Sequence, residues 1–351
     1  MRYEGLTPRK CSIADTVVET VHRVLPRHAN PVNTLHGGIA LEWAISSATL
    51  AASRVARGPV VLASLDHVFF VSPVYIGENA VLTSWVELVG ETSIMITTLM
   101  EAEKPETGEK RVTTLAHMTM VAVDNNLKPR RVNAIVKPMS SIEEALFFDA
   151  MRRRSTSYRC RARGSHPIGD TGKPVPLVEG FELESIRFAY PEDTVLLDVV
   201  DAGRLLYYMD ELAGITALRY VREPVVTASV DYTCFYSPIW VGETIQFSSA
   251  LTYIGRKSLE VTVKVVSRNE MTGDEKHTTT AYFTMVHVGL DGRAKPVPQY
   301  TPTSPGEVRV YREGEARRRQ RLKLLSSFTD RFGDYQRMGE WLRRHKRLGK
   351  L

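Results

Sequence analysis

The sequence predicts an α+β fold that occurs twice in one chain, each copy an antiparallel sheet wrapped around one long helix. Three observations predict it. The chain has 351 residues, enough for two domains of about 150 residues each. It repeats itself at a fixed spacing of 165 residues. Each copy has one long apolar helical segment beside several strand-like segments, a pattern unlike the regular alternation of a doubly wound parallel sheet.

The repeat is visible in single motifs and in a long alignment. The motif VVLASLD at residues 60–66 returns as VVTASVD at residues 225–231. Between residues 60–123 and 225–288 the alignment needs no gap, and 23 of 64 positions are identical. Chance similarity between two globular segments does not hold one register over that length. We therefore expect a duplicated domain.

The elements of the first copy follow in order from its hydrophobic pattern. An alternating run at Ser12–Val24 predicts a strand. The Ala- and Leu-rich segment Gly38–Arg54 has apolar residues at helical spacing and predicts the long helix. Ser-Pro, Gly-Glu and Thr-Gly turn signals then separate three longer strands, Ala80–Val89, Ser93–Glu103 and Lys110–Val123.

The second copy has the same order of elements. A strand is expected at Phe181–Ala189 and the long helix at Gly203–Arg219. Between the copies, Ser141–Arg163 predicts a connecting helix, followed by a Gly- and Pro-rich segment. The predicted organisation is a first domain at 1–130, a linker with a helix at 131–180, a second domain at 181–300 and a tail at 301–351.

The net charge of +6 comes from the tail. Residues 316–351 contain 12 Lys and Arg and 3 Asp and Glu, a balance of +9. The rest of the chain contains the remaining 34 basic and 37 acidic residues, a balance of −3. Any argument for an anionic partner therefore applies to the tail alone. Leu, Phe and Trp among its charges predict one or two amphipathic helices there.

Cysteine usage and hydropathy indicate a cytoplasmic protein. Cys11, Cys160 and Cys234 lie far apart without a CxxC pair, which argues against a disulfide scaffold or a structural zinc site. No stretch reaches the ~20 apolar residues that a membrane helix needs. The N-terminal segment has charges but no apolar core, so we do not expect a signal peptide.

Motif searches exclude several chemistries. The sequence has no GxSxG, no HExxH and no GxGxxG after a strand. Gly164 and Gly169 have the spacing of a phosphate-binding loop, but Asp170 stands at the position of its lysine. The nine histidines include no pair at metal-ligand spacing. We therefore expect neither a metal nor a cofactor.

Two features remain as candidates for chemistry. Gly37-Gly38 opens the first long helix, where free N–H groups and the helix dipole can bind a carbonyl oxygen or an anion, although such a pair also permits tight packing. On the second long helix, Asp210 and Glu211 interrupt an apolar stretch. At 100° per residue both side chains cannot easily face solvent, and a carboxylate on the core side is costly unless it is paired or functional.

At this point the residues resemble a known family. The segments VVDAGRLLYYMDELAGITALR, VVTASVDYTCFYSPIWVGE, GRKSLEV and AYFTMVHV are similar to the acyl-CoA thioesterases of the hot dog fold. Two such domains in one chain resemble, more narrowly, the cytosolic or brain-type acyl-CoA hydrolases, whose tandem domains form a pseudo-dimer. The resemblance covers roughly residues 10–130 and 180–300. It implies a double hot dog fold, with acyl-CoA as substrate.

The resemblance also implies a site between the two domains. In that family an Asn in the loop before one helix, and the N-terminus of that helix, face an Asp on the helix of the partner domain. These features fall on Asn30, on His36-Gly37-Gly38 and on Asp210. The implied reaction is thioester hydrolysis, with the Gly37 and Gly38 amides holding the oxyanion and Asp210 acting as general base or as nucleophile.

The repeat adds an asymmetry to this assignment. The 165-residue shift maps Asn30 onto Val195 and Asp210 onto Ile45, both apolar. Of the two interfacial sites that a pseudo-dimer allows, one therefore has both polar groups and the other has neither. We expect a single composite site per chain.

Four further residues are candidates for substrate binding, together with His36. Ser64, on the strand of the ASLD motif, is expected to line the pocket. Arg256, Lys257 and Ser258 form a turn that could bind the CoA phosphates, although a solvated hairpin turn explains them equally well. The resemblance also implies further assembly, as a homo-oligomer and most often as trimers of the double unit.

Two other functions stay open from the sequence. A non-catalytic acyl-CoA-binding regulator could use the same fold, with its basic tail on nucleic acid or a membrane. Asn30 and Asp210 together argue against it, because a sensor needs neither, so we do not expect nucleic acid as a partner. A hydratase of the same fold would need a catalytic Asp-His pair near the helix start, and His36 has no Asp at the expected offset in the sequence.

Overall fold

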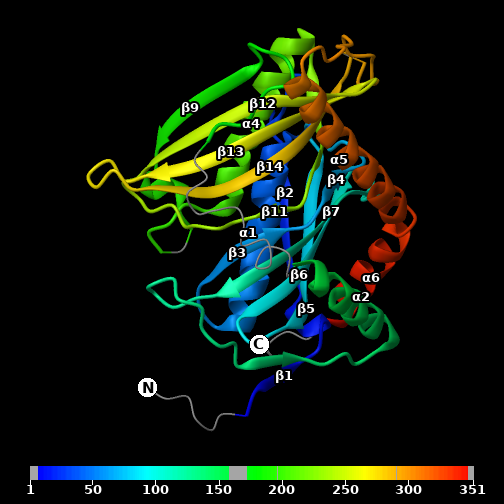
Figure 1. Cartoon of the computed structure of the whole chain (residues 1–351). Coiled ribbons are helices and arrows are strands. Elements are labelled where there is room, and N and C mark those ends of the chain that lie inside the picture. Colours follow the sequence, from blue (N-terminus) through cyan, green and yellow to red (C-terminus); the bar gives the residue numbers. More distant parts are fainter. Residues whose placement is uncertain (1–6, 158–171, 196, 290, 347–351) are drawn as a thin grey trace.

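The computed structural model describes residues 7–157, 172–195, 197–289 and 291–346. Within these residues, two halves with the same order of elements lie against each other (Figure 1). In each half, a long helix is followed by two short strands and then by three long antiparallel strands. A further strand precedes each helix and forms the outer edge of its half.

The first half contains one long helix and an antiparallel sheet. Helix α1 has apolar residues at helical spacing. The residue after its last turn, Arg57, caps the helix with a positive φ of 51°, in the left-handed region. The long strands are adjacent in sequence and in the sheet, as short turns favour. The elements are α1 (Gly37–Ala56), β2 (Val18–Arg23), β3 (Val60–Leu65), β4 (Val68–Phe70), β5 (Asn79–Val89), β6 (Ser93–Glu103) and β7 (Lys110–Ala122).

The second half repeats this arrangement. Its helix ends in the same way, at Arg222 with a φ of 59°. Its elements are α4 (Ala202–Val221), β9 (Glu182–Phe188), β10 (Val225–Val230), β11 (Thr233–Cys234), β12 (Thr244–Ile254), β13 (Ser258–Arg268) and β14 (Glu275–His287).

The two sheets join edge to edge into one sheet of 12 strands. β4 pairs with β10 in antiparallel register, with Phe69 opposite Ser229. β3 pairs with β11 in the same way, with Ser64 opposite Cys234. The main path runs β2-β5-β6-β7-β4-β10-β14-β13-β12-β9. Backbone hydrogen bonds therefore continue from one half into the other, and neither half has a free inner edge.

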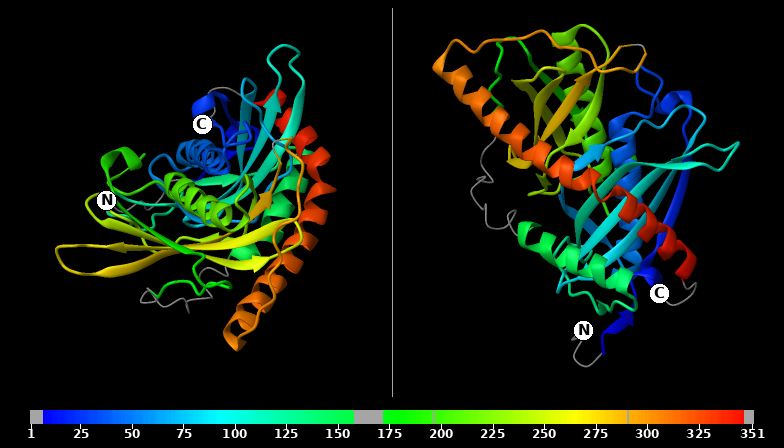
Figure 2. Two further views of the ribbon diagram at one scale, coloured as in Figure 1. Left: turned by 90° about the horizontal axis from the view of Figure 1, so that it is seen from above. Right: turned by 90° about the vertical axis from the view of Figure 1, so that its right-hand side faces the viewer.

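The helices α1 and α4 lie antiparallel on the inner side of this curved sheet (Figure 2). A Cβ added at Gly38 would lie 2.9 Å from Cα of Tyr207, and one added at Gly203 would lie 3.0 Å from Cα of Glu42. These two contacts are equivalent under the 165-residue shift and run in opposite directions along the two helices. Glycine at both positions therefore lets the helix backbones approach closely.

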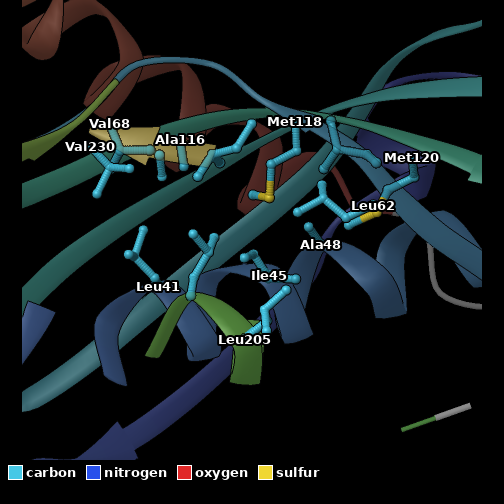
Figure 3. Close-up of a cluster of buried hydrophobic side chains, with 14 of the residues drawn as sticks. Leu41, Ile45, Ala48, Leu62, Val68, Ala116, Met118, Met120, Leu205 and Val230 are labelled. Atoms are coloured by element: carbon cyan, nitrogen blue, oxygen red, sulfur yellow. The ribbon is translucent and has the colours of Figure 1, made fainter. Parts of the chain in front are cut away.

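The core lies between the helices and the sheet and draws on both halves. Figure 3 shows side chains of α1 pointing at strands of the first half, with a leucine of α4 among them. All of the labelled side chains are buried, and they are Leu41, Ile45, Ala48, Leu62, Val68, Ala116, Met118, Met120, Leu205 and Val230. The halves thus share one core and are not separately packed domains.

Three more helices cover the outer face of the sheet. They are α2 (Ser141–Ser157), α5 (Pro305–Thr329) and α6 (Phe332–His345). α5 crosses the second half, where a Cβ at Gly314 would lie 2.6 Å from Cβ of Tyr253, and α6 crosses the first half, where Gly339 lies against Leu99 (Figure 2). Because helices cover both faces, the central strands are buried along nearly their whole length.

Buried ion pairs attach these outer helices to the sheet. Arg321 on α5 binds Asp231 through two hydrogen bonds of 2.6 and 2.8 Å and reaches Glu260 at 2.6 Å. Arg343 on α6 binds Glu101 at 2.6 Å. Much of the positive charge of the tail is thus neutralised within the chain.

Most predicted elements are confirmed. The predicted amphipathic tail forms α5 and α6. The first predicted strand, Ser12–Val24, is wrong in its N-terminal part, because Ala14–Thr16 forms a 3-10 turn and only Val18–Arg23 is a strand. The short strand β1 (Arg9–Cys11) pairs instead with β8 (Ala134–Val136) in a separate two-stranded sheet.

The predicted linker helix is described over most of its length. α2 extends to Ser157, and the rest of its predicted range, to Arg163, lies outside the described residues, as does Cys160. Cys11 is a buried free thiol, whereas Cys234 is disulfide-bonded, so the expectation from cysteine spacing does not hold for Cys234. Among the described helices, none combines the length and apolar character needed to cross a membrane.

Candidate active site

A cavity of about 400 Å³ lies between the halves, where the N-terminus of α1 meets α4 and β10. It is lined by residues of both halves. The first half contributes the loop before α1 and its first turn, and the second half contributes one stripe of α4 and the start of β10. Its polar and charged lining residues are Asn30, His36, Asp210, Glu211, Arg222, Glu223 and Thr227.

The carboxylate of Asp210 lies at the N-terminus of the helix of the opposite half. The Gly38 N–H donates to Oδ2 at 2.6 Å, and the Thr227 hydroxyl donates to Oδ1 at 2.7 Å. Nδ1 of His36 lies 3.4 Å from Oδ2. The carboxylate is 1% exposed. A helix N-terminus stabilises an anion through its free N–H groups and its dipole, so α1 and α4 together position this charge.

Burial raises the pKa of the Asp210 carboxyl above its ordinary value. The charge of His36, the Thr227 hydroxyl and the Gly38 N–H act in the opposite direction, but burial outweighs them. A carboxyl with a raised pKa is a stronger base once it is ionised. Asp210 therefore has the environment of a group that takes up a proton, or attacks, during a reaction.

Gly37 leaves space for this arrangement. A Cβ at this position would lie 2.7 Å from Cβ of Thr227 and 3.1 Å from Oδ2 of Asp210. Any other residue would therefore push Thr227 and Asp210 away from the helix N-terminus. Among the described residues, no acceptor faces the Gly37 N–H. This group points from the helix end beside the carboxylate and is free to bind a ligand oxygen.

The prediction that the Gly37 and Gly38 amides together hold the oxyanion needs a correction. The Gly38 N–H is already bound to Asp210, and Nδ1 of His36 also accepts from it at 3.2 Å. The sequence could not show this, because the acceptor comes from the other half of the chain. Of the two glycines, only Gly37 has an N–H without an acceptor among the described residues.

Asn30 lines the same cavity, and its side chain is fixed by its own loop. Its Oδ1 accepts from the N–H groups of Val32 and Thr34, at 3.1 and 3.2 Å, and its Nδ2 donates to the Thr34 hydroxyl at 2.8 Å. An amide has two N–H donors, so one remains for a ligand. The loop thus pre-orients this donor at the cavity wall.

The other predicted binding residues lie elsewhere. Ser64 is buried opposite Cys234 and Thr119 and is not among the residues that line the cavity, so the prediction for Ser64 is wrong. Ser64 lies on β3, whereas the strand that lines this cavity is β10 of the other half. Arg256, Lys257 and Ser258 form the turn between β12 and β13, outside the cavity lining.

That turn is nevertheless close to the site. Ser258 pairs with Val286, the neighbour of Met285, and Met285 lines the cavity. Arg256 and Lys257 are exposed. Their contribution to phosphate binding stays a prediction.

Sequence analysis missed Thr227, which holds the second oxygen of Asp210. A signal for it exists in the repeat. The shift of 165 residues maps Thr227 onto Leu62, the one polar-to-apolar difference between the motifs VVTASVD and VVLASLD. It belongs to the same pattern as Asn30 and Asp210, whose equivalents are also apolar.

The comparisons with known proteins agree with this geometry. The family model of the Thioesterase superfamily matches the chain twice, at residues 32–109 and 199–273. Over 132 residues the chain is 33% identical to the "Uncharacterized acyl-CoA thioester hydrolase YkhA" of Bacillus subtilis (strain 168), covering 38% of this chain and 77% of that protein. The chain belongs to the Thioesterase superfamily. Each match includes a long helix and the strands after it, so both halves are thioesterase domains and the fold is the expected double hot dog.

Two other relatives cover different lengths of the chain. The "Cytosolic acyl coenzyme A thioester hydrolase" of Homo sapiens is 28% identical over 307 residues, which is 83% of this chain and 80% of the human protein. "Protein VdlD" of Helicobacter pylori (strain ATCC 700392 / 26695) is 38% identical over 123 residues, which is 35% of this chain and 70% of that protein. The human protein thus matches across both halves of the chain, whereas each of the two bacterial proteins matches over about the length of one domain.

Proposed function

We propose that this protein is an acyl-CoA thioesterase, which hydrolyses acyl-CoA to the free acid and CoA at a single composite site between its two halves. The observation that carries the proposal is the position of Asp210. A buried carboxylate with a raised pKa lies beside a free helix N–H in a cavity formed by both halves of a thioesterase-superfamily chain. The names of the relatives support acyl-CoA as the substrate.

The site supplies the groups that thioester hydrolysis requires. The thioester carbonyl points its oxygen at the Gly37 N–H and the free N–H of Asn30, which stabilise the negative charge that develops on it. Asp210 takes a proton from a water molecule as that water attacks the carbonyl carbon, or it attacks that carbon itself to form an anhydride that water then hydrolyses. In both routes the C–S bond breaks and the sulfur leaves with a proton as the CoA thiol.

Positioning of Asp210 depends on both halves. Thr227 holds Oδ1 and Gly38 holds Oδ2, so the carboxylate cannot rotate freely. We assign Thr227 and Gly38 as positioning residues and Asn30, Gly37 and Asp210 as catalytic residues. His36, 3.4 Å from Oδ2, adds positive charge when it is protonated and lies at the cavity wall, where substrate passes.

The phosphates of CoA require cations near the cavity, and Arg222 is one that lines it, beside Glu223. We propose that Arg256 and Lys257, exposed on the β12–β13 turn, bind them, with Ser258 beside them. The turn follows β12 and lies next to the strand that brings Met285 into the cavity. Arg256→Ala with Lys257→Ala should raise KM for acyl-CoA and leave kcat within a few-fold, because these groups bind a part of the substrate that does not react. An unchanged KM would assign the phosphates elsewhere.

The proposed site is tested by thiol release from acyl-CoA. Asp210→Asn and Asn30→Ala should each lower kcat by ~10²–10⁴, the usual cost of losing an aligned catalytic group. The kcat of the double variant should be only slightly below that of the less active single variant, because the two groups act on one transition state. An Asp210→Asn protein with near wild-type turnover would contradict the assignment.

The matched controls are the equivalent positions of the other half. Ile45→Leu and Val195→Ile exchange apolar residues for similar ones, and turnover should stay within a few-fold. The same thiol assay on these proteins separates loss of chemistry from loss of folding. Equal losses at both sets of positions would argue for two working sites or for a general defect.

We also propose a cytoplasmic location, supported by the names of three mammalian relatives, and assembly into trimers of the double unit. Light scattering on the purified protein tests the assembly, with an expected mass of three times 39.4 kDa. No finding favours the alternative of a regulator whose basic tail binds nucleic acid or a membrane. The arginines of α5 and α6 that bind Asp231, Glu260 and Glu101 are engaged within the chain.

A further inference from the structure

A second cavity, of about 310 Å³, lies at the position related to the active site by the internal repeat. It is formed where the N-terminus of α4 meets α1 and β3. Eight of its lining residues are the 165-residue equivalents of residues that line the first cavity. They are Ile45, Thr49, Val60, Val61, Leu62, Val195, Asp201 and Ala202. The second cavity is therefore the counterpart of the active site in the fold.

The polar groups of the active site are replaced in this counterpart by apolar side chains. Ile45 occupies the position equivalent to Asp210, and Leu62 occupies that of Thr227. Val195 occupies the position of Asn30 in the loop before the helix. Each of these three residues lines the cavity. Further apolar residues, such as Leu205 and Phe235, complete the walls. The space is thus kept while the reactive groups are removed.

The N-terminus of α4 also differs from that of α1. Its first N–H groups are capped by a carboxylate from the same half, since Gly203 and Arg204 donate to Oδ1 of Asp201 at 2.8 and 3.2 Å. Burial raises the pKa of Asp201, which lines the cavity. The amide of Gly203 is thus occupied, as that of Gly38 is in the active site, and the equivalent of Gly37 is Ala202, whose N–H has no acceptor among the described residues. What this cavity lacks is the carboxylate on the opposing helix, because Ile45 occupies the position of Asp210.

We infer that this second cavity is a non-catalytic binding site for the aliphatic chain of an acyl thioester. Its walls are built from the same positions as the active site and are more apolar, so the chain that fits the first cavity gains apolar contacts in the second. The thioester carbonyl meets no carboxylate from the opposing helix, because Ile45 replaces Asp210 there, and the carboxylate of Asp201 is held by the helix N-terminus of its own half. Acyl groups therefore bind there without being hydrolysed.

The charges exclude other classes of ligand. Asp201 is the one carboxyl group among the described lining residues, and no Lys, Arg or His accompanies it. A free fatty acid would place its carboxylate near this group without a cation to pair with, which is unfavourable in a partly buried site. The site should therefore prefer the neutral thioester, or a thioether of the same shape, over the product acid.

The test counts bound ligand by calorimetry. The probe is S-decyl pantetheine, a thioether that has no carbonyl to hydrolyse and no phosphates to bind the basic turn. We expect two equivalents per chain in the wild-type protein. Thr49→Trp fills the second cavity from α1, and its equivalent Gly214→Trp fills the first from α4. Each should bind one equivalent, and Thr49→Trp should keep wild-type turnover within a few-fold while Gly214→Trp loses it.

A second variant covers the case in which Thr49→Trp does not fold. Val195 is 59% exposed at the cavity, so Val195→Trp should fold and should also remove one equivalent. A single equivalent in the wild type, or a second equivalent that survives both Thr49→Trp and Val195→Trp, would overturn the inference. Decanoic acid should bind the second site at least tenfold more weakly than the thioether, and equal binding would also count against it. The binding count does not depend on turnover, so failure of the proposed function at Asp210 would be seen separately.

Discussion

At the scale of single residues, the environment of Asp210 sets the expected pH dependence. Burial raises the pKa of this carboxyl, and the Thr227 hydroxyl lowers it in part. Since the ionised form acts as base or nucleophile in the proposed mechanism, kcat/KM should fall as the pH drops through this raised pKa. Thr227→Val removes the hydroxyl and should move the acid limb to higher pH. Thiol release measured between about pH 4 and 9 checks this, and an acid limb at the value of an ordinary aspartate would contradict it.

The same pKa shift predicts the effect of Asp210 on stability. A carboxyl whose pKa is raised by folding binds its proton more tightly in the folded state. The folded state is therefore penalised for ionised Asp210 above that pKa, and the penalty disappears at low pH. Asp210→Asn, whose amide can still accept from Gly38 and donate to Thr227, should raise Tm at neutral pH. The gain should shrink towards acid pH in thermal scans, and a variant that is less stable at pH 7 would refute the argument.

Gly214 lines the active-site cavity from the middle of α4. A Cβ there would meet nothing within 4 Å, and glycine costs about 1 kcal/mol relative to alanine inside a helix. Gly214→Ala should therefore raise Tm. Larger residues at the same position, Val and then Leu, should lower kcat/KM for acyl-CoA in order of volume, because they occupy space that the substrate needs. Thr49→Leu is the control in the other half, and its kcat/KM should stay near wild type.

The repeat made part of the site predictable from sequence. The family resemblance implied the pairing of Asn30 with Asp210, the repeat supported it because both equivalents are apolar, and the structure places both residues in one cavity. The same comparison could have found Thr227. It could not find that Asp210 occupies the Gly38 N–H, because this contact joins different halves. The prediction for Ser64 failed because its strand, β3, does not line this cavity, which is lined by β10 of the other half.

At the scale of secondary-structure elements, the crossing of α1 and α4 depends on glycine. A Cβ at Gly203 would lie 3.0 Å from Cα of Glu42, which is backbone and cannot move alone. Gly203→Ala should therefore destabilise the protein, by ~1–3 kcal/mol as for other overpacked sites, despite its better helix propensity. Gly214→Ala, on the same helix but facing open space, should have the opposite sign. Urea denaturation of the two variants measures both, and equal effects would show that packing at the crossing is not limiting.

Sequence patterns predicted the long elements well and the short ones poorly. Both long helices extend one or two residues beyond their predicted ends, since caps rather than periodicity decide where a helix ends. The three long strands of the first half match within about one residue. The run Ser12–Val24 alternates like a strand, but the Thr16 hydroxyl binds the Ile13 carbonyl and closes a 3-10 turn. Such local hydrogen bonds compete with strand pairing and leave little trace in hydropathy.

At the scale of the whole molecule, the C-terminal helices complete the outer face of the sheet. They supply the arginines for buried acids, of which Asp231 and Glu260 share Arg321. The basic surplus of the tail is visible in the sequence, but its ion pairs are not. The acids that pair with the tail arginines lie on or beside strands far away in the chain. Loss of residues 301–351 would remove the arginines that pair with these acids and would uncover the outer face of the sheet, so we expect truncation to lower stability.

A matched pair of arginines on α5 tests this. Arg321 is 7% exposed, whereas Arg319, paired with Glu315, is 67% exposed. Arg321→Ala should destabilise the protein by ~3–5 kcal/mol, the usual cost of removing one partner from a buried ion pair. Arg319→Ala should cost ~0–1 kcal/mol, as for exposed pairs. Denaturant unfolding gives both values, and a small effect at Arg321 would mean that its acids find other partners.

The two halves are covalently joined in one chain, and this changes how each half can evolve. When two identical chains form such a pair, one gene encodes both halves and every substitution appears on both sides of the interface. Here each side has its own codons. Exchange of an acid for isoleucine or of threonine for leucine can alter one cavity and leave the other as it was. A duplicated gene can therefore divide two tasks, hydrolysis and retention of an acyl group, between surfaces that an ancestor with identical subunits would have had to change together.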